Sequence, residues 1–466
     1  MTIYDSVKKA KVEFKPQNSD EVLIYVCGPT VYDDAHLGHA RSAIAFDMLR
    51  RVLKVDGYNV TFVKNITDVD DKILKKMSDD NRTLEELTEY YSNSYHEDMD
   101  ALNVLSPDIE PKATKSIDAM KDLITTLLEK EYAYKTDNGD VYFDTSKDDD
   151  YLSISKRSFE YETQSRIEKN SNKKNSADFA LWKNCNKDEA VCFDSNFGSG
   201  RPGWHTECSA MIEKHLARDS YEYAIDIHGG GADLLFPHHE NEAAQTRCAT
   251  DHKLAKYWMH NGFVTINGEK MSKSLGNSFF LKDALKHYHG EVLRYYLCTT
   301  NYRQDLSFNE EDLKNSKKRL DRIFRLKKRL LSIAPAKNAN IEFIKSMKDA
   351  MNDDMNSSVA LASIDEMIAN ANELLDSNMS KNEKKEVVAN LDFINELLGF
   401  GKIDAYEYFQ FGIDDKLKER IENLIMLRDN AKREKDYALA DSLRDDIKKL
   451  NISIMDTPNG TVWEKL

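Results

Sequence analysis

The sequence predicts a mixed α/β fold that gives way to helices toward its C-terminus, and three features support this. Residues 21–26 form a short apolar run that ends at a Gly-Pro pair, which is typical of a buried strand closed by a turn. Apolar side chains then recur at helical spacing over 39–56, and residues 60–63 are rich in β-branched and aromatic side chains. Beyond about Asn309 glycine almost disappears, and apolar residues recur at helical spacing as far as Leu398.

The strand–helix–strand order over 21–63 predicts one half of a parallel sheet, whose ligand crevice lies at the carboxyl ends of its strands. The composition turns polar over about 147–199. We therefore predict an insertion that splits the sheet at about 125–199, with a mobile loop near 168–176. Residues 200–261 return to the sheet, and the strand-like 262–266 leads into a loop at 270–275. The first domain is expected to cover 1–308.

Two further units follow the first domain. The helical pattern predicts a bundle over 309–400. After a Gly-Phe-Gly segment, Leu417, Ile421 and Leu424 fall on one helix face, and a second helical stripe follows. Its members are Leu439, Leu443, Ile447 and Leu450. Asn459-Gly460 between two β-rich runs predicts a hairpin, so a small α/β domain is expected over 401–466.

Composition restricts the class of protein. The 466 residues leave room for roughly three domains. With 41% hydrophobic and 32% charged residues, the chain is an ordinary globular protein. Its net charge of −15 argues against indiscriminate binding to polyanions, although a local basic face can still contact phosphates. No apolar run approaches the roughly 18 residues of a membrane span, and the N-terminus lacks a secretory pattern, so we expect a cytoplasmic protein.

The six cysteines are scattered and form no dense framework, which fits a reducing compartment. Cys185, Cys192, Cys248 and Cys298 have no ligand-type neighbours, so we expect buried structural thiols at these four positions.

Histidines and glycines provide the first chemical signals. His36 and His39 lie three residues apart where a strand enters a helix, beside backbone N–H groups that attract phosphate. The run Gly229-Gly230-Gly231 permits close approach of a ligand to the backbone, but a tight structural turn explains it equally well. The lysine-rich segment 270–274 adds positive charge. Together these features favour a nucleotide site.

Four other residues could hold a metal ion. His238 and Glu242 are four residues apart, so on a helix they project from one face. Spacing alone favours a plain surface pair, because Cys208 lies 30 residues upstream and Cys27 a further 181. If all four did converge, two thiolates with an imidazole and a carboxylate would suit zinc.

The wording and order of these motifs resemble class I aminoacyl-tRNA synthetases, and specifically the cysteinyl-tRNA synthetase family. Residues 36–39 stand where that class has its HIGH motif, and 270–274 match its KMSKS motif letter for letter. The resemblance covers nearly the whole chain. It also includes Cys27-Gly28-Pro29-Thr30, the segments 65–72, 200–205 and 227–242, and Asp456-Thr457-Pro458-Asn459-Gly460-Thr461.

This resemblance implies a class I Rossmann-type catalytic domain over 1–308, with a stem-contact region at about 262–308 and a KMSKS loop at 270–274. The unit at 401–466 would bind the anticodon side of tRNA. The implied reaction activates L-cysteine with ATP to cysteinyl-adenylate and then transfers cysteine to tRNA(Cys). The implied protein is a monomer.

The resemblance also assigns roles to residues. One Zn²⁺ per subunit would be held by Cys27, Cys208, His238 and Glu242, and would bind the substrate thiolate. ATP would come with Mg²⁺, and catalysis would fall to His36, His39, Lys270 and Lys273. ATP contacts would involve His36, His39, Lys273, Gly229 and Gly230. The amino-acid pocket would be lined by Thr67, Trp204, His205, His228 and His239, although a packed core residue explains any one of these five equally well on bottom-up grounds.

Three alternatives compete with this reading. Related ligases deliver cysteine to a small amino-sugar acceptor, but they lack the full C-terminal region, and residues 428–441 here resemble the anticodon-side domain. A non-catalytic RNA-binding relative would have lost a ligand or a motif lysine, and none is missing. A purely structural zinc competes with the substrate-binding one, since four protein ligands usually form a closed site.

Overall fold

The computed structural model describes residues 1–157, 173–185, 189–218, 220–250, 252–266, 269–270, 279–457 and 460–465, with only the backbone at 269–270. The first domain is built on a four-stranded parallel sheet of order β10-β9-β3-β4. These strands are β3 (Glu21–Val26), β4 (Asn59–Lys64), β9 (Tyr223–Gly231) and β10 (Lys253–Asn261). All but β4 are buried almost throughout, as expected for parallel strands covered on both faces.

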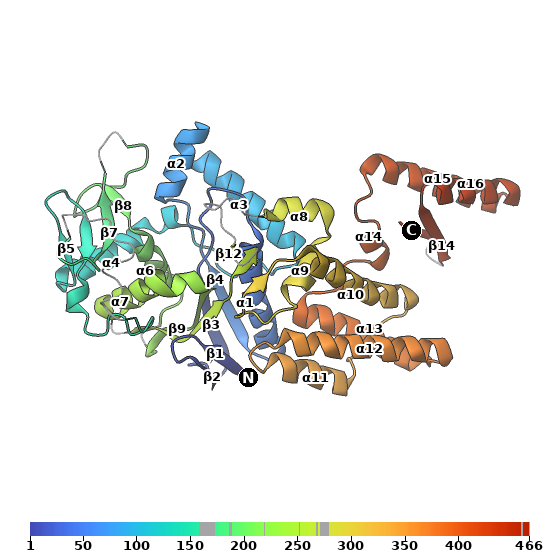
Figure 1. Cartoon of the computed structure of the whole chain (residues 1–466), viewed down its shortest axis with the longest axis horizontal. Helices are drawn as coiled ribbons and strands as arrows, with labels where there is room; N and C mark the ends of the chain where they lie inside the picture. The colour runs from blue at the N-terminus through green and yellow to red at the C-terminus, as the bar shows by residue number, and fades with distance from the viewer. Residues whose placement is uncertain are drawn as a thin grey trace.

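Helices cover this sheet (Figure 1). The helix α1 (Leu37–Val55) connects β3 to β4 and buries most of its length, including Phe46 and Leu49. The flanking helices are α2 (Asp71–Asp80), α3 (Leu84–Ala101), α6 (Trp204–His215) and α7 (Glu240–Ala249). The predicted strand–helix–strand order over 21–63 is confirmed. A separate two-stranded sheet pairs β1 (Thr2–Asp5) with β2 (Ala10–Glu13).

The predicted insertion carries its own antiparallel sheet, of order β5-β6-β7-β8. It follows α4 (Ile117–Glu129) and comprises β5 (Ala133–Lys135), β6 (Val141–Phe143), β7 (Phe179–Asn184) and β8 (Gly200–Pro202). In Figure 1 this sheet lies at one end of the molecule. The first part of the polar loop near 168–176 lies outside the described residues.

The sheet domain leads into the helices through a small β unit, in which β11 (Val264–Ile266) pairs with β12 (Glu269–Lys270) and with β13 (Leu306–Ser307). In the sequence, two helices lie between β12 and β13: α8 (Leu281–His287) and α9 (Gly290–Leu297). The predicted bundle then consists of α10 (Glu310–Arg329), α11 (Ile341–Met351), α12 (Ser357–Ser377) and α13 (Lys381–Leu398).

A buried ion-pair network joins the bundle to helix α1 of the first domain. Arg294 of α9 is fully buried and pairs with Asp47 of α1, and it donates to the carbonyl oxygen of Leu398 at 2.7 Å. Arg51 donates to Asp47 at 2.8 Å and to the carbonyl oxygen of Asn395 at 3.1 Å. Two guanidinium groups thus cap the C-terminal end of α13, where the helix carbonyls carry partial negative charge.

The chain ends in a small unit of α14 (Ala405–Phe409), α15 (Asp415–Arg433), α16 (Tyr437–Lys449) and a hairpin of β14 (Ile452–Thr457) and β15 (Gly460–Lys465). The predicted hairpin is confirmed. The helix α15 through to β15 has a core of its own, which includes Ile421, Ile447 and Trp463. In Figure 1 this unit lies at the opposite end of the molecule from the insertion. None of the helices in the described ranges is long and apolar enough to cross a membrane.

The cysteine prediction holds in part. Cys248 and Cys298 are buried free thiols. The prediction is wrong for Cys185 and Cys192, which form a disulfide. The fold of the insertion brings their Cα atoms to 6.1 Å, within the range that a disulfide spans.

Candidate functional site

Four side chains distant in the sequence meet at the carboxyl end of the central sheet. Cys27 directly follows β3, Cys208 lies on α6, His238 belongs to a π-helical turn (Leu235–His239), and Glu242 lies in the first turn of α7. Their ligand atoms all lie within 4.8 Å of one another. The two sulfur atoms are 3.7 Å apart. Thiolates on one tetrahedral zinc, each bound at about 2.3 Å, stand about 3.8 Å apart.

The remaining spacings around these atoms are similar. Cys27 Sγ lies 3.7 Å from Glu242 Oε1, and Cys208 Sγ lies 3.7 Å from His238 Nε2. His238 and Glu242 are closer, with 2.7 Å between Nε2 and Oε1, which is a hydrogen-bond distance. The helical pairing expected from their four-residue spacing is therefore present, but it lies in the interior, with both side chains buried.

The electrostatics of this cluster divide the four candidate ligands: Cys208 and Glu242 favour the deprotonated form that binds a metal, whereas burial raises the pKa of the Cys27 thiol well above its usual range and His238 holds a proton. The hydrogen bond from Cys27 lowers the pKa of Cys208 to about 6, which favours its thiolate. Burial opposes the charge of Glu242, but His238 and His228 outweigh it and hold its pKa well below the usual range. Burial also opposes the charge of His238, and Glu242 with Cys208 overcomes this and raises its pKa to about 10. A metal ion would take the place of the His238 proton.

A second combination of ligands shares two of these residues. Cys27, His228, His239 and Glu242 also bring one ligand atom each within 4.8 Å of one another. His228 Nε2 lies 2.6 Å from Glu242 Oε2, and Cys27 Sγ lies 3.3 Å from His239 Nε2. The first set contains two sulfur ligands where this one contains a single sulfur, and zinc favours thiolates.

The other expected pocket residues surround the cluster. Trp204 is 39% exposed and stacks on the His238 ring, with 4.1 Å between ring centroids. His205 Nδ1 lies 3.0 Å from His238 Nδ1. The His228 and His239 rings stack at 4.2 Å. Thr67 is buried and donates from Oγ1 to Glu207 at 2.8 Å. The structure thus brings the five expected pocket residues together beside the four candidate ligands.

His36 and His39 form the N-terminus of α1. His36 is the N-cap and its Nδ1 accepts from the backbone N–H of Gly38 at 3.0 Å, while its own N–H donates to His39 Nδ1 at 3.1 Å. The rings stack at 4.0 Å. Because each Nδ1 accepts a hydrogen bond, each ring carries its proton on Nε2. Both rings therefore present an N–H donor at the positive end of a helix.

The glycines at 229 and 230 lie within strand β9, so their interpretation as a tight turn is wrong. A Cβ at Gly229 would lie 2.2 Å from Phe46 Cε1, and one at Gly230 would lie 2.8 Å from Leu234 Cδ1 and 3.2 Å from His239 Cε1. Close packing on both faces of the strand therefore requires glycine here.

The KMSKS segment is described only at its start. Lys270 lies on β12, where its backbone pairs with Thr265, and Lys273 lies outside the described residues. Past the segment, the backbone returns to the His36 turn: Leu37 donates to the carbonyl oxygen of Phe279 at 3.3 Å, and Leu281 donates to that of Ala35 at 2.8 Å. These two hydrogen bonds join the chain that follows the KMSKS segment to the first turn of α1.

Three residues near the cluster were not assigned roles from the sequence. Asn65 Oδ1 accepts from the backbone N–H of Gly28 at 2.8 Å and lies 3.9 Å from Cys208 Sγ. Glu207 is buried, and burial with the nearby Cys208 raises its pKa well above the usual range. His260 Nε2 lies 2.9 Å from His239 Nδ1. Asn65 lies in a segment that carried the family resemblance, whereas Glu207 and His260 have no local sequence signal.

Comparisons with known proteins identify the family. The model for the "tRNA synthetases class I (C) catalytic domain" matches residues 13–318, and the DALR domain model matches 346–401. A cysteine–tRNA ligase of Aliarcobacter butzleri is 63% identical over 465 residues, covering 100% of this chain and 99% of the relative. The chain belongs to the cysteine–tRNA ligase family. A relative of the same name from Nitratiruptor sp. is 60% identical, with both chains covered completely.

Membership makes this chain an ATP-dependent ligase of the aminoacyl-tRNA synthetase class. Solved structures of other class I members share its fold. A methionyl-tRNA synthetase of Mycobacterium tuberculosis, solved with methionyl-adenylate, aligns with a TM-score of 0.57 at 15% identity, covering 87% of this chain and 94% of that one. A leucyl-tRNA synthetase of Agrobacterium radiobacter, solved with tRNA, has the same TM-score at 11% identity, covering 87% of each chain.

Proposed function

We propose that this cysteine–tRNA ligase selects L-cysteine by binding its thiolate to a Zn²⁺ held by Cys27, Cys208, His238 and Glu242. The observation that carries the proposal is the convergence of these four ligand atoms, with the two sulfur atoms 3.7 Å apart, at the carboxyl end of the parallel sheet. Ligands of open α/β sheets bind at this edge. The bound metal would lower the pKa of the substrate thiol, whereas the serine hydroxyl is a poor ligand for it.

Discrimination by shape alone reaches only about 10–200-fold between near-isosteres, so a metal–sulfur bond supplies selectivity that a pocket wall does not. The neighbouring residues position the ligands. His205 is neutral because burial lowers its pKa to about 3, so its Nδ1 can accept a hydrogen bond from the Nδ1–H of His238 and fix the orientation of that ring. Trp204, stacked on the same ring and partly exposed, forms the outer wall.

Adenylate formation places negative charge on the α-phosphate as the cysteine carboxylate attacks and pyrophosphate leaves. We assign the stabilisation of this charge to His36 and His39, whose Nε2–H donors lie at the N-terminus of α1. Lys270 and Lys273 would neutralise the phosphates together with Mg²⁺, and Gly229 and Gly230 would border the adenosine. The transfer step then moves cysteine to the terminal ribose of tRNA(Cys).

The tRNA acceptor is favoured over a small amino-sugar acceptor because the chain matches tRNA ligases over its full length. The proposal assigns the catalytic domain to 1–308, the bundle to 309–400 and anticodon binding to 401–466. We also propose that the enzyme is a monomer and that it works in the cytoplasm.

The experiment that tests this function is ATP–pyrophosphate exchange with cysteine, and with serine in parallel, before and after zinc chelation. We expect exchange with cysteine alone, its loss on chelation, its return with Zn²⁺, and charging of tRNA(Cys). Exchange that survives complete removal of zinc would contradict the metal's role. Exchange without tRNA charging would instead support the small-molecule acceptor.

A further inference from the structure

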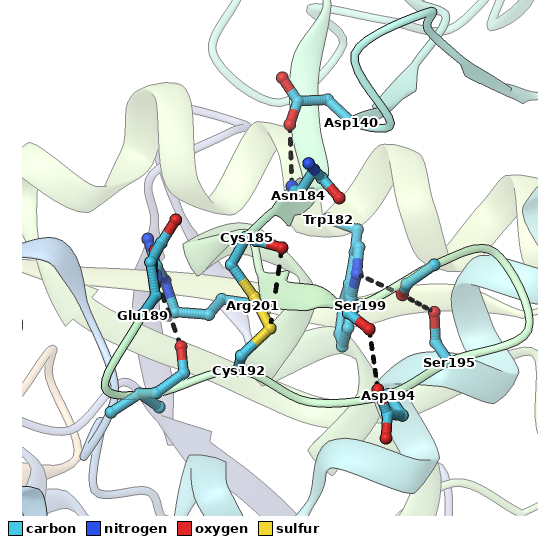
Figure 2. Close-up of a disulfide and its surroundings, with 12 residues drawn as sticks. Asp140, Trp182, Asn184, Cys185, Glu189, Cys192, Asp194, Ser195, Ser199 and Arg201 are labelled. Atoms are coloured by element: carbon cyan, nitrogen blue, oxygen red, sulfur yellow. Dashed lines mark hydrogen bonds and ion pairs between the residues drawn. A yellow bond between two sulfur atoms is a disulfide. The ribbon is translucent and has the colours of Figure 1, made fainter. Parts of the chain in front are cut away.

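The disulfide between Cys185 and Cys192 stands at the base of a three-segment β ribbon in the insertion (Figure 2). Gly200, the first residue of β8, pairs with Asn184 on one side. On the other side it exchanges two backbone hydrogen bonds with Phe193, at 2.8 and 2.9 Å. Cys185 follows Asn184 and Cys192 precedes Phe193. The bond therefore links the two segments that flank the start of β8.

This ribbon supports the helix that carries part of the proposed cysteine site. Only three residues lie between Gly200 and Trp204, the first residue of α6. The carbonyl oxygen of Leu181, on β7, accepts from the backbone N–H of Gly203 at 2.8 Å and from Thr206 Oγ1 at 3.3 Å. A change in how firmly β7 and β8 are held therefore acts on the N-terminus of α6, which bears Trp204 and His205.

An ion pair also restrains this ribbon, and one of its partners, Glu189, lies between the two cysteines that the disulfide joins. Arg201 of β8 pairs with Glu189 and donates to the carbonyl oxygen of Val191 at 3.3 Å. Its other terminal nitrogen lies 3.9 Å from Asp71 at the start of α2, and Lys183 of β7 lies 2.5 Å from the same carboxylate. Figure 2 shows Glu189 and Arg201 beside the disulfide, and Glu189 lies in the segment between the two linked cysteines.

The surroundings of the two sulfur atoms favour a bond that opens and closes. In a reducing compartment, disulfides are mostly transient, catalytic or redox-sensing. Cys192 is partly exposed, whereas Cys185 is 6% exposed, so a small molecule meets Cys192 first. The substrate of this enzyme is itself a thiol, and its oxidised form is a small disulfide.

We propose that Cys185 and Cys192 are a reversible oxidation site for small disulfides of the cystine class, and that the closed bond holds the N-terminus of α6 in its cysteine-binding arrangement. The second part rests on the proposed function, since it assumes that Trp204 and His205 line the cysteine pocket.

The exchange balances without any further reagent. The Cys192 thiolate attacks one sulfur of cystine, forms a mixed disulfide and releases one cysteine thiolate. The Cys185 thiolate then attacks the Cys192 sulfur, closes the protein disulfide and releases the second cysteine. Two protein thiols are oxidised, one cystine is reduced to two cysteines, and the two thiol protons pass to the leaving thiolates. An excess of cysteine or another thiol reverses both steps.

The test uses the full-length, zinc-loaded enzyme, reduced with dithiothreitol and freed of it, and then incubated with or without cystine. Free thiols are alkylated and mapped by mass spectrometry. We expect cystine to protect Cys185 and Cys192 and to leave Cys248 unchanged. Hydrogen exchange should show amides of 199–206 exchanging faster in the reduced form. In initial-rate pyrophosphate exchange, the reduced form should have a cysteine KM about two- to fivefold higher, with the ATP KM unchanged.

Variants separate this effect from general oxidation. Cys192→Ser and Cys185→Ser should resemble the reduced enzyme in cysteine KM and form no protein disulfide with cystine. Cys185→Ser should stop at a mixed disulfide on Cys192, whereas the matched variant Cys248→Ser should respond as the wild type does. Thiols at 185 and 192 that stay fully alkylatable after cystine would overturn the oxidation site. Equal cysteine KM and equal amide exchange in the two forms of the wild-type enzyme would overturn its link to α6. Zinc-dependent pyrophosphate exchange by the reduced enzyme at saturating cysteine tests the proposed function separately, because the disulfide is proposed to change the cysteine KM and is not required for exchange itself.

Discussion

The packing of Gly229 against Phe46 gives a prediction whose size follows from the structure. A Cβ at Gly229 would lie 2.2 Å from Phe46 Cε1 and 2.5 Å from Cζ, whereas carbon atoms in contact stand about 3.5–4.0 Å apart. The ring must therefore retreat by more than an ångström inside the main core, where it is 1% exposed. Overpacking of this kind costs about 1–3 kcal/mol, so Gly229→Ala should lower the free energy of unfolding by that amount.

Shortening the ring should relieve the clash. Phe46→Leu alone should cost roughly 1–3 kcal/mol, but combined with Gly229→Ala it makes room for the new methyl group. We expect the double variant to be more stable than the sum of the single losses by about 1–2 kcal/mol. Urea unfolding of the four proteins, followed by fluorescence, measures the main transition of each. Losses that simply add would refute the contact between residue 229 and Phe46.

The same four proteins separate packing from ATP contact. If glycine is needed only for packing, the double variant should regain the wild-type KM for ATP in pyrophosphate exchange. If the nucleotide also lies against this backbone, the double variant should regain stability while its ATP KM stays raised.

Three further predictions concern other parts of the chain. Cys208→Ser should lower the zinc content and raise the cysteine KM together, whereas Lys273→Ala should slow exchange and leave the zinc content near normal. Metal analysis and exchange kinetics check both variants. A zinc-depleted Cys208→Ser protein with unchanged cysteine affinity would contradict the role of the metal in selecting cysteine. Burial and the neighbouring Asp34 raise the pKa of Asp98 to about 7, above the value of about 3.9 in an unfolded chain. Between these two pKa values the folded state binds a proton that the unfolded state has lost, so the free energy of unfolding falls as pH rises from about 4 to 7. In thermal melts, Asp98→Asn should therefore stabilise the protein at pH 8 but not at pH 4. Equal shifts of the melting temperature at both pH values would contradict this. Removal of residues 412–466 should leave cysteine-dependent exchange near wild type and reduce the charging of tRNA(Cys) by at least about tenfold, and equal losses in both assays would argue against a separate anticodon-binding role.

The parts of the fold that depend on local pattern were predictable. The apolar run at 21–26 and the helical spacing over 39–56 gave β3 and α1 to within a few residues, because the periods of strands and helices are written in neighbouring positions. The hydrophobic stripe beginning at Leu439 was less accurate. Leu439 is 49% exposed, and Ile447 is the member of that stripe that is buried on α16.

The site could not be derived from spacing. Cys27 and Cys208 are brought together by the order of the central strands, which no local pattern encodes, and only the family resemblance pointed to them. The glycine run left a ligand contact and a tight turn as equal alternatives, because glycine serves in both; the strand position excludes the turn at 229 and 230, and close packing there was not foreseen. The disulfide was missed because two cysteines seven residues apart give no signal until the ribbon around β8 has formed.

The division of hydrophobic cores bears on how such a protein can change over evolutionary time. One cluster runs from Ile3 and the central sheet through α1 and α9 to Phe400 and on to Tyr408 of α14, so the catalytic domain and the bundle share side chains at their junction. A separate cluster of five residues holds the terminal unit together: Ile421, Ile425, Ile447, Ile452 and Trp463. Substitutions in the shared core must satisfy both of the parts that it joins. The part from α15 to β15 is free of that constraint, whereas α14 packs into the shared core. That part can therefore diverge, be lengthened or be exchanged at its own pace while the machinery for activating the amino acid is conserved.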